Sequence, residues 1–194
     1  MDLFGAGTPD PQPTAVELTE SDTLMVVDKN IHNTPHRYEL VQGKEAVQVL
    51  VQQLMQQPEI CFDTETTGLD AHTAELVGLS FSWKTGEGWY VPCPANRDEC
   101  LELLNLFRPL FEKEEMVWVG QNIKYDLLML KWYGFELKGK LFDTMLAHYV
   151  IEPEGKRSMD ALSEKYLGYE PVHIEELIGK KGKNQGNMRD VEPE

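Results

Sequence analysis

The chain has 194 residues, of which 41% are hydrophobic and 26% are charged, and its formal net charge is −15. This length and composition are typical of one globular domain with a core of its own, and no run of about 18 apolar residues or signal peptide is visible, so we expect no membrane span and no secretion. The three cysteines form no C-x-x-C pair and are odd in number, which favours a reducing, cytoplasmic setting over a disulfide framework.

The acidity also bears on partners. Proteins that bind nucleic acid on their own usually carry a basic patch, and this chain has 33 acidic against 18 basic residues. If nucleic acid is the substrate, metal ions, a few local basic side chains or a neighbouring domain must offset the repulsion. The charge therefore argues against tight autonomous binding, but not against chemistry on nucleic acid.

The predicted elements begin after residues 1–22, which are rich in glycine and proline and which we interpret as a linker or disordered arm. Short strands are expected at 23–27 and 37–41, and apolar residues at helical spacing predict a helix over 44–57 that ends at Pro58. A strand beginning at Glu59 follows. Two further strands, 76–83 and 88–91, flank a hairpin turn and precede a helix over 97–111.

The second half alternates in the same way. We expect a strand at 116–121, a helix over 123–133, a helix capped by Asp143 that runs to 153, and helices over 159–167 and 174–178. Residues 186–194 lack apolar periodicity and are predicted to form a loose tail. Strands near the start, followed by alternating helices and strands, predict an α/β layered fold with a central mixed β-sheet flanked by helices.

Two acids close the strand that begins at Glu59. Asp63 and Glu65 are two residues apart, so on a strand their side chains point to the same face. Paired carboxylates repel each other unless a cation relieves them, and oxygen ligands at this spacing suit Mg²⁺ or Mn²⁺. The alternative is a solvated strand end that enters an acidic turn.

A second candidate lies where a strand passes through a glycine-containing step into a helix. The segment reads Gly120-Gln121-Asn122-Ile123-Lys124-Tyr125-Asp126. Ligands of α/β sheets gather at strand ends and helix N-termini, so a carboxylate in the first helical turn could face the acid pair. The alternative role for this aspartate is compensation of the helix dipole.

Taken together, the two motifs resemble the DEDD family of 3′–5′ exonucleases. The second motif is similar to that of the proofreading domain of bacterial DNA polymerase I, as are the segments Phe142-Asp143-Thr144-Met145-Leu146 and Met159-Asp160-Ala161-Leu162. The resemblance covers residues 37–185. It implies a ribonuclease H-like fold, an exonuclease domain over 23–185, and a single-stranded DNA 3′ end and the polymerase domain of the same parent chain as partners of a monomer.

The resemblance also implies roles for individual residues. Asp63 and Glu65 would bind the metal that activates the attacking water, and Asp63 and Asp126 would hold a second ion, with release of a nucleoside 5′-monophosphate. Lys156 or Arg157 would meet the DNA backbone. The residues that would line the 3′-terminal nucleotide are Thr66, Leu69, Gln121, Asn122, Lys124 and Tyr125. Ile174 stands where a relative has an aromatic wedge.

One motif of the family, Tyr-x-x-x-Asp on a late helix, is missing. The nearest match, Tyr166 to Glu170, is interrupted by Gly168 and comes too early in the chain. We therefore expect a C-terminally incomplete exonuclease domain that hydrolyses DNA weakly or not at all. The two competing hypotheses are a free-standing exoribonuclease of the same superfamily and a non-catalytic module that braces a polymerase.

Overall fold

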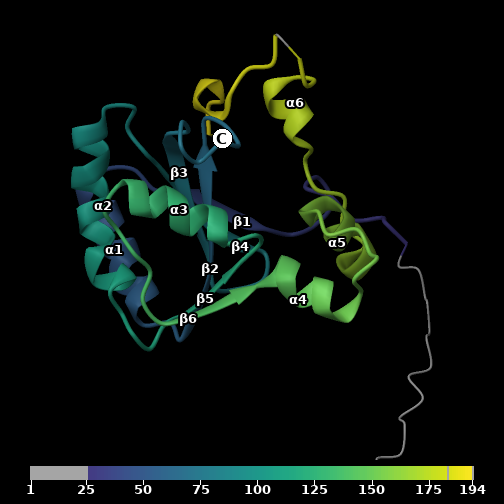
Figure 1. The fold of residues 1–194 in the computed structure, drawn as a ribbon, viewed down its shortest axis with the longest axis horizontal. Helices are drawn as coiled ribbons and strands as arrows, with labels where there is room; N and C mark the ends of the chain where they lie inside the picture. The colour runs from purple at the N-terminus through teal and green to yellow at the C-terminus, as the bar shows by residue number, and fades with distance from the viewer. Residues whose placement is uncertain (1–25, 183, 194) are drawn as a thin grey trace, which may run out of the picture.

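The computed structural model describes residues 26–182 and 184–193 of the chain (Figure 1). The expected arm at 1–22 and the start of the expected strand at 23–27 lie outside these residues. The described part forms one six-stranded sheet in the order β1-β4-β3-β2-β5-β6. Its strands are β1 (Arg37–Leu40), β2 (Glu59–Thr66), β3 (Leu76–Ser82), β4 (Glu87–Pro92), β5 (Val117–Gly120) and β6 (Lys140–Asp143).

The sheet is mixed, as predicted. The β2, β3 and β4 strands pair antiparallel, whereas β1 runs parallel to β4, and β5 lies parallel to both β2 and β6. The parallel pairs need long crossovers, which the helices provide. Those helices are α1 (Lys44–Met55), α2 (Arg97–Phe111), α3 (Lys124–Trp132), α4 (Thr144–Ile151), α5 (Met159–Leu167) and α6 (Ile174–Ile178), with a final 3₁₀ turn η1 (Met188–Asp190).

One face of the sheet holds the main hydrophobic core. Side chains alternate along β2, so Ile60 and Phe62 point into the core while the residues between them point away. The Phe62 ring contacts the rings of Phe81, Phe111 and Trp118, all of which are almost fully buried. Each such side chain stabilises the fold by roughly 2 kcal/mol. The helices α1, α2 and α3 cover this face (Figure 1).

The structure departs from the sequence prediction at two places. The strand β6 was not expected, because its mostly exposed residues show no alternation of buried and exposed positions, and its pairing with β5 defines it. The segment expected to be a loose tail contains η1. There, Arg189 donates hydrogen bonds to the carbonyl oxygens of Cys93 (3.1 Å) and Leu76, at neighbouring ends of the sheet. This segment is held in place by hydrogen bonds from the Arg189 guanidinium, so the pattern of hydrophobic residues could not predict that it is ordered.

Within the described residues, none of the helices combines the length and hydropathy that a membrane crossing requires.

Candidate active site

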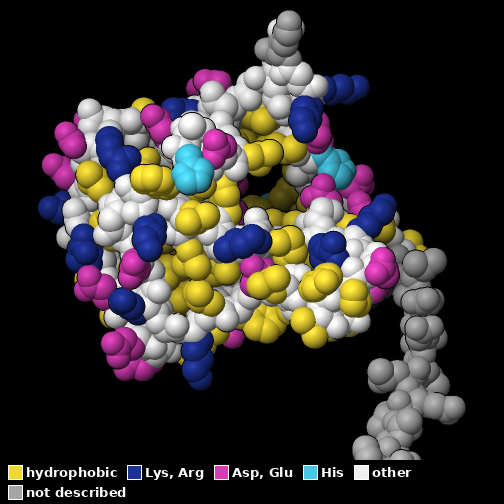
Figure 2. Space-filling view, in the orientation of Figure 1, with side chains coloured by type: hydrophobic (Ala, Val, Ile, Leu, Met, Phe, Trp, Pro, Cys, Tyr) yellow, Lys and Arg dark blue, Asp and Glu magenta, His cyan; other side chains and the backbone are white. Residues whose placement is uncertain are grey.

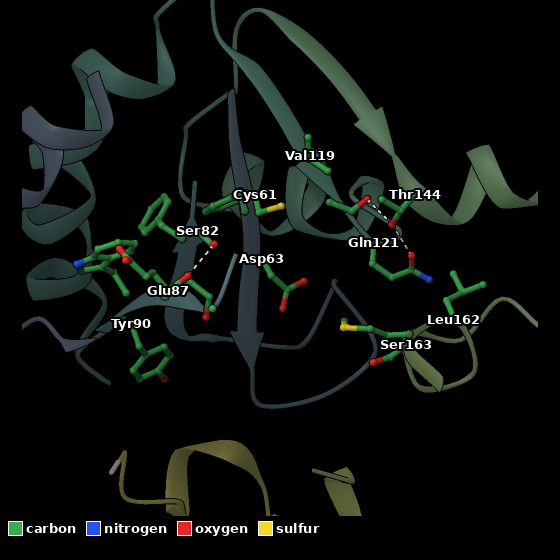
Figure 3. Close-up of a pocket in the computed structure, with 18 of the residues that line it drawn as sticks. Cys61, Asp63, Ser82, Glu87, Tyr90, Val119, Gln121, Thr144, Leu162 and Ser163 are labelled. Atoms are coloured by element: carbon green, nitrogen blue, oxygen red, sulfur yellow. Dashed lines mark hydrogen bonds between the residues drawn. The ribbon is translucent and has the colours of Figure 1, made fainter. Parts of the chain in front are cut away.

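Asp63 and Glu65 lie on the face of the sheet that the core helices leave open. The two carboxylates share this face with Cys61, and across the β2–β3 pair Asp63 lies opposite Ser80. This face forms the floor of a cleft of about 1300 Å³, with side chains of α4 and α5 on its far wall. Figure 3 shows Asp63 pointing into the cleft toward Gln121 and Ser163, and Figure 2 shows a hollow between the sheet and the α5–α6 arm. The prediction that the acid pair faces one side is confirmed.

The position of the acid pair makes its negative charges unfavourable. Burial, followed by the negative charges of Asp126 and Glu65, raises the pKa of Asp63 to about 7, although the backbone N–H of Thr64 acts in the other direction. Burial also raises the pKa of Glu65. Burial and nearby negative charges disfavour an ionised carboxylate, and a bound cation favours it. Both acids are thus partly buried rather than fully solvated.

Asp126 reaches β2 from the opposite side. Its Oδ1 accepts hydrogen bonds from the backbone N–H of Thr64 (2.9 Å) and from the Thr64 hydroxyl (2.6 Å). Thr64 lies between the two acids along the strand, so its side chain points to the helix-covered face. Asp126 is itself buried, and burial raises its pKa to about 6 against the lowering effect of the Thr64 bonds. The sequence predicted its proximity to the acids, but not this anchoring.

The three carboxylates are divided between the two faces of β2, because Asp126 bonds to Thr64 on the helix-covered face. Across residues 26–182 and 184–193, no group of three His, Cys, Asp or Glu side chains is gathered closely enough to hold a metal ion. The chemistry of the donors nevertheless fits a hard divalent cation, because all three are carboxylates whose charge is unfavourable without one. Asp63 and Glu65 are the two that share the cleft.

The step between β5 and α3 is fixed by Asp143. Its Oδ1 accepts hydrogen bonds from the backbone N–H of Asn122 (3.1 Å) and of Met145 (2.9 Å), so Asp143 caps α4 as predicted and also holds the turn. Asn122 adopts φ 58°, the left-handed conformation that asparagine tolerates better than most residues. Its side-chain oxygen accepts a hydrogen bond from the Lys124 ammonium.

The Gln121 side chain makes hydrogen bonds within the protein. Its amide nitrogen donates to the carbonyl oxygen of Arg157 (2.7 Å), and its amide oxygen accepts from the hydroxyl of Thr144 (2.5 Å), as Figure 3 shows for the second bond. The side chain therefore ties the end of β5 to α4 and to the loop before α5. Each end of its amide makes a hydrogen bond to another part of the chain, and its contact with substrate stays a prediction.

The loop after β2 is tied to α3 through Tyr125. The Tyr125 hydroxyl lies 2.8 Å from the Thr66 hydroxyl and donates to the carbonyl oxygen of Gly68 (2.5 Å). Leu69, the next residue of this loop, is 94% exposed. The structure thus brings Thr66 and Tyr125 together and leaves an apolar side chain in solvent beside them.

The remaining predicted contacts lie on the arm that carries α5 and α6. Lys156 is exposed in the loop between α4 and α5. Arg157 donates to the carbonyl oxygen of Pro153 (2.6 Å) and its guanidinium stacks over the ring of Tyr149. Ile174 begins α6 and is partly exposed. Of the two basic candidates, Lys156 is therefore the one whose side chain stands in solvent.

Sequence reasoning missed Thr64 and Tyr90. The signal for Thr64 was present, because a polar residue between two strand acids must face the other side of the sheet. Tyr90 lines the cleft from β4, with its ring over Gly78. A glycine inside a strand is a recognised sign of such a close approach, although it does not identify the approaching residue.

Comparison with known proteins agrees with this arrangement. Residues 38–189 match the model of a family described as 3′–5′ exonuclease. DNA polymerase I of Borreliella burgdorferi is 36% identical over 165 residues, or 83% of this chain and 18% of that protein. DNA polymerase I of Pseudomonas aeruginosa is 36% identical over 158 residues, or 75% of this chain and 17% of that protein. The chain thus spans less than a fifth of the length of these curated relatives.

Solved structures share the fold. The catalytic core of RRP6 from Trypanosoma brucei (mutant C496S) superposes with a TM-score of 0.58 at 19% identity, covering 82% of this chain and 40% of that one. NrnC of Brucella melitensis with bound Mg²⁺ gives 0.55 at 16% identity, covering 73% and 65%. The ribonuclease H-like layered fold is confirmed. The chain belongs to the 3′–5′ exonuclease family found in bacterial DNA polymerase I.

Proposed function

We propose that this domain removes nucleotides from the 3′ end of single-stranded DNA, as the proofreading part of a DNA polymerase I, and releases nucleoside 5′-monophosphates. The observation that carries the proposal is the partly buried pair of Asp63 and Glu65 on the floor of a cleft, in a chain of this exonuclease family. Its curated relatives are named DNA polymerase I, which supports DNA as the substrate.

Asp63 and Glu65 would hold one divalent ion, Mg²⁺ or Mn²⁺. Asp63 would also touch a second ion, which Asp126 would hold largely through water. When bound, two such ions stabilise the attacking and leaving oxygens of a phosphodiester. The protein fixes the positions of the carboxylates. Thr64 does this for Asp126 through two hydrogen bonds. The Mg²⁺ bound to Brucella melitensis NrnC, a protein of the same fold, supports the choice of ion.

We assign the substrate contacts to predicted residues whose side chains are exposed or partly exposed. We assign the terminal base to Leu69 and the ring of Tyr125, because an exposed apolar side chain and an aromatic face suit a base plane. Thr66, Asn122 and Lys124 would supply polar contacts to the same nucleotide, and Lys156 would meet the DNA backbone. Gln121 would act on substrate through the loop that it holds.

Manganese binding tests the metal assignment. Calorimetric titration of the wild type and of Asp63→Asn should show Mn²⁺ binding that the variant loses. The exposed Glu59→Gln, on the same strand, is the matched control and should bind as the wild type does. Equal Mn²⁺ binding by wild type and Asp63→Asn would overturn the assignment and favour the bracing module.

Cleavage tests the reaction. A 5′-labelled single-stranded DNA incubated with Mn²⁺ should shorten from its 3′ end and release nucleoside 5′-monophosphates, detected by mass spectrometry, and Asp63→Asn should abolish this. Because residues 1–194 lack the Tyr-x-x-x-Asp motif, we expect a rate far below the roughly 10 s⁻¹ that is typical of enzymes. Turnover at that usual rate would refute the expectation of a weak site.

An exoribonuclease is the second candidate, because the structural neighbours include Escherichia coli RNase D, whose structure is described as that of an exoribonuclease involved in structured RNA processing. DNA and RNA strands of the same sequence, offered in competition, separate the two. Preferential shortening of the RNA would favour the second candidate.

The setting of the domain is part of the proposal. We propose that residues 23–185 form the exonuclease domain, that it works in the cytoplasm beside a polymerase domain of the same parent chain, and that it is a monomer by itself. The much greater length of the relatives supports the polymerase partner. Light scattering during gel filtration tests the monomer, and a mass twice that of the chain would contradict it.

A further inference from the structure

Tyr90 stands in the same row of the sheet as the acid pair. The strand register places it opposite Ser80 on β3, which in turn lies opposite Asp63 on β2. Residues that lie opposite each other on paired strands point to the same face. The Tyr90 side chain therefore rises from the floor of the cleft, and Figure 3 shows it beside the end of β2.

The Tyr90 ring does not stand upright but leans over Gly78. A Cβ atom built on Gly78 would lie 2.2 Å from both the Cζ and the hydroxyl oxygen of Tyr90, so the phenol end fills the place of the missing side chain. Gly78 is the cross-strand partner of Glu65. Side chains of such partners begin about 5 Å apart. The Tyr90 hydroxyl therefore occupies the place of the missing Gly78 side chain, next to Glu65 on the neighbouring strand.

The chemistry of the two groups is complementary. The phenol of Tyr90 is a hydrogen-bond donor, whereas an ionised carboxylate such as that of Glu65 only accepts. The bond from the Tyr90 hydroxyl to the carbonyl oxygen of Val77 is long, at 3.4 Å. A hydroxyl proton turned toward a carboxylate makes a shorter, charge-assisted bond.

We propose that Tyr90 is a positioning residue for Glu65: its hydroxyl donates to the Glu65 carboxylate, directly or through one water, and fixes the direction in which that carboxylate faces the cleft. The role rests on the proposed function only in what Glu65 goes on to bind. Gly78 is part of the arrangement, because a Cβ atom there would displace the phenol end of Tyr90.

The first test uses the metal-free protein, so it does not depend on metal binding or cleavage. In protein labelled with ¹³C at the glutamate carboxyl carbon, the Glu65 resonance is assigned with Glu65→Gln. At one fixed pH, Tyr90→Phe should shift this resonance while it keeps the ring over Gly78. Tyr38→Phe is the matched control, since Tyr38 also lines the cleft and leans over a glycine, Gly88. An unchanged Glu65 resonance in Tyr90→Phe would overturn the proposal.

Two further variants separate positioning from packing. Gly78→Ala keeps the hydroxyl but displaces the ring, and should shift the Glu65 resonance as Tyr90→Phe does. Tyr90→Phe should also weaken Mn²⁺ binding by about tenfold, the lower end of what a hydrogen bond to a charged group contributes. Equal Mn²⁺ affinity of Tyr90→Phe and wild type would refute a role toward the ion. Loss of the Asp63 dependence of Mn²⁺ binding would instead count against the proposed function alone.

Discussion

Replacing Asp63 by asparagine should stabilise the metal-free protein at neutral and alkaline pH. Asparagine keeps the shape of the side chain and its acceptor for the Thr64 backbone N–H, but removes a charge that burial and two neighbouring carboxylates disfavour. The native state without metal holds this charge at a cost in free energy of unfolding. The variant should therefore be more stable and less functional than the wild type.

The magnitude follows from the pKa of Asp63. A rise from an ordinary value of 3.8 to about 7 corresponds to about 4 kcal/mol if the carboxylate were wholly cut off from water. Asp63 is only partly buried, and part of its pKa shift comes from the charges of Asp126 and Glu65. Water and relaxation around the site reduce the effect, so we expect about 2 kcal/mol.

The direction with pH is fixed by which state binds the proton more tightly. The raised pKa means that the folded protein holds the proton of Asp63 more strongly than the unfolded chain does. The stability that this proton contributes is fully present below the unfolded pKa, about pH 4, and is lost as the pH rises through about 7. The advantage of Asp63→Asn should be absent below about pH 4, grow between these limits and stay constant above them.

Urea unfolding followed by tryptophan fluorescence, in EDTA and over a series of pH values, measures this difference. Glu59→Gln removes an exposed carboxylate from the same strand and is the control, with no such pH-dependent gain expected. Asp63→Asn that is no more stable than the wild type above pH 7, or equally favoured at every pH, would refute the electrostatic reasoning.

Mn²⁺ should reverse the order of stability. At 100 times its dissociation constant, an ion bound only by the folded state adds about 2.7 kcal/mol. The wild type should gain this and Asp63→Asn should not. Equal gains in both proteins would mean that the ion binds elsewhere.

Three further predictions concern side chains that hold the site together. Thr64→Val should destabilise the protein by about 2 kcal/mol, because it removes the hydroxyl bond to the buried Asp126, and urea midpoints equal to wild type would contradict this. Gln121→Ala should speed amide hydrogen exchange around Arg157 by roughly tenfold, whereas unchanged exchange would show that other contacts hold the loop. Arg189→Gln should make residues 184–193 easier to digest with a protease, as measured by mass spectrometry, and digestion at the wild-type rate would argue against its two backbone bonds.

Much of the fold could be predicted because its elements carry their own signals. The helix α2 was expected at its observed bounds, since its apolar residues repeat at helical spacing. The strand β6 has no such pattern, and only pairing with β5 makes it a strand. The contact of Arg189 with the ends of β3 and β4 joins residues about a hundred positions apart, which no local pattern contains.

For the candidate site, the sequence predicted on which face of the strand the side chains lie, but not their hydrogen-bond partners. That Asp63 and Glu65 share a face follows from the two-residue period alone. That Asp126 would bond to Thr64 required knowing from which side α3 approaches β2. The engagement of Gln121 depends on the loop before α5, whose path only the tertiary structure fixes.

The arrangement around β2 shows how two carboxylates of this strand and one of α3 are accommodated in the fold. Two of them face the cleft, while Asp126 lies on the helix-covered side, where two hydrogen bonds from Thr64 compensate its charge. The negative charge of Asp126 still helps to raise the pKa of Asp63, and it does so more strongly than the charge of Glu65. Asp63 has the most strongly raised pKa of the three and stands to gain most from a cation. In the metal-free folded protein, the charges of these carboxylates are unfavourable. A bound cation would remove this cost, so the same charges favour metal binding.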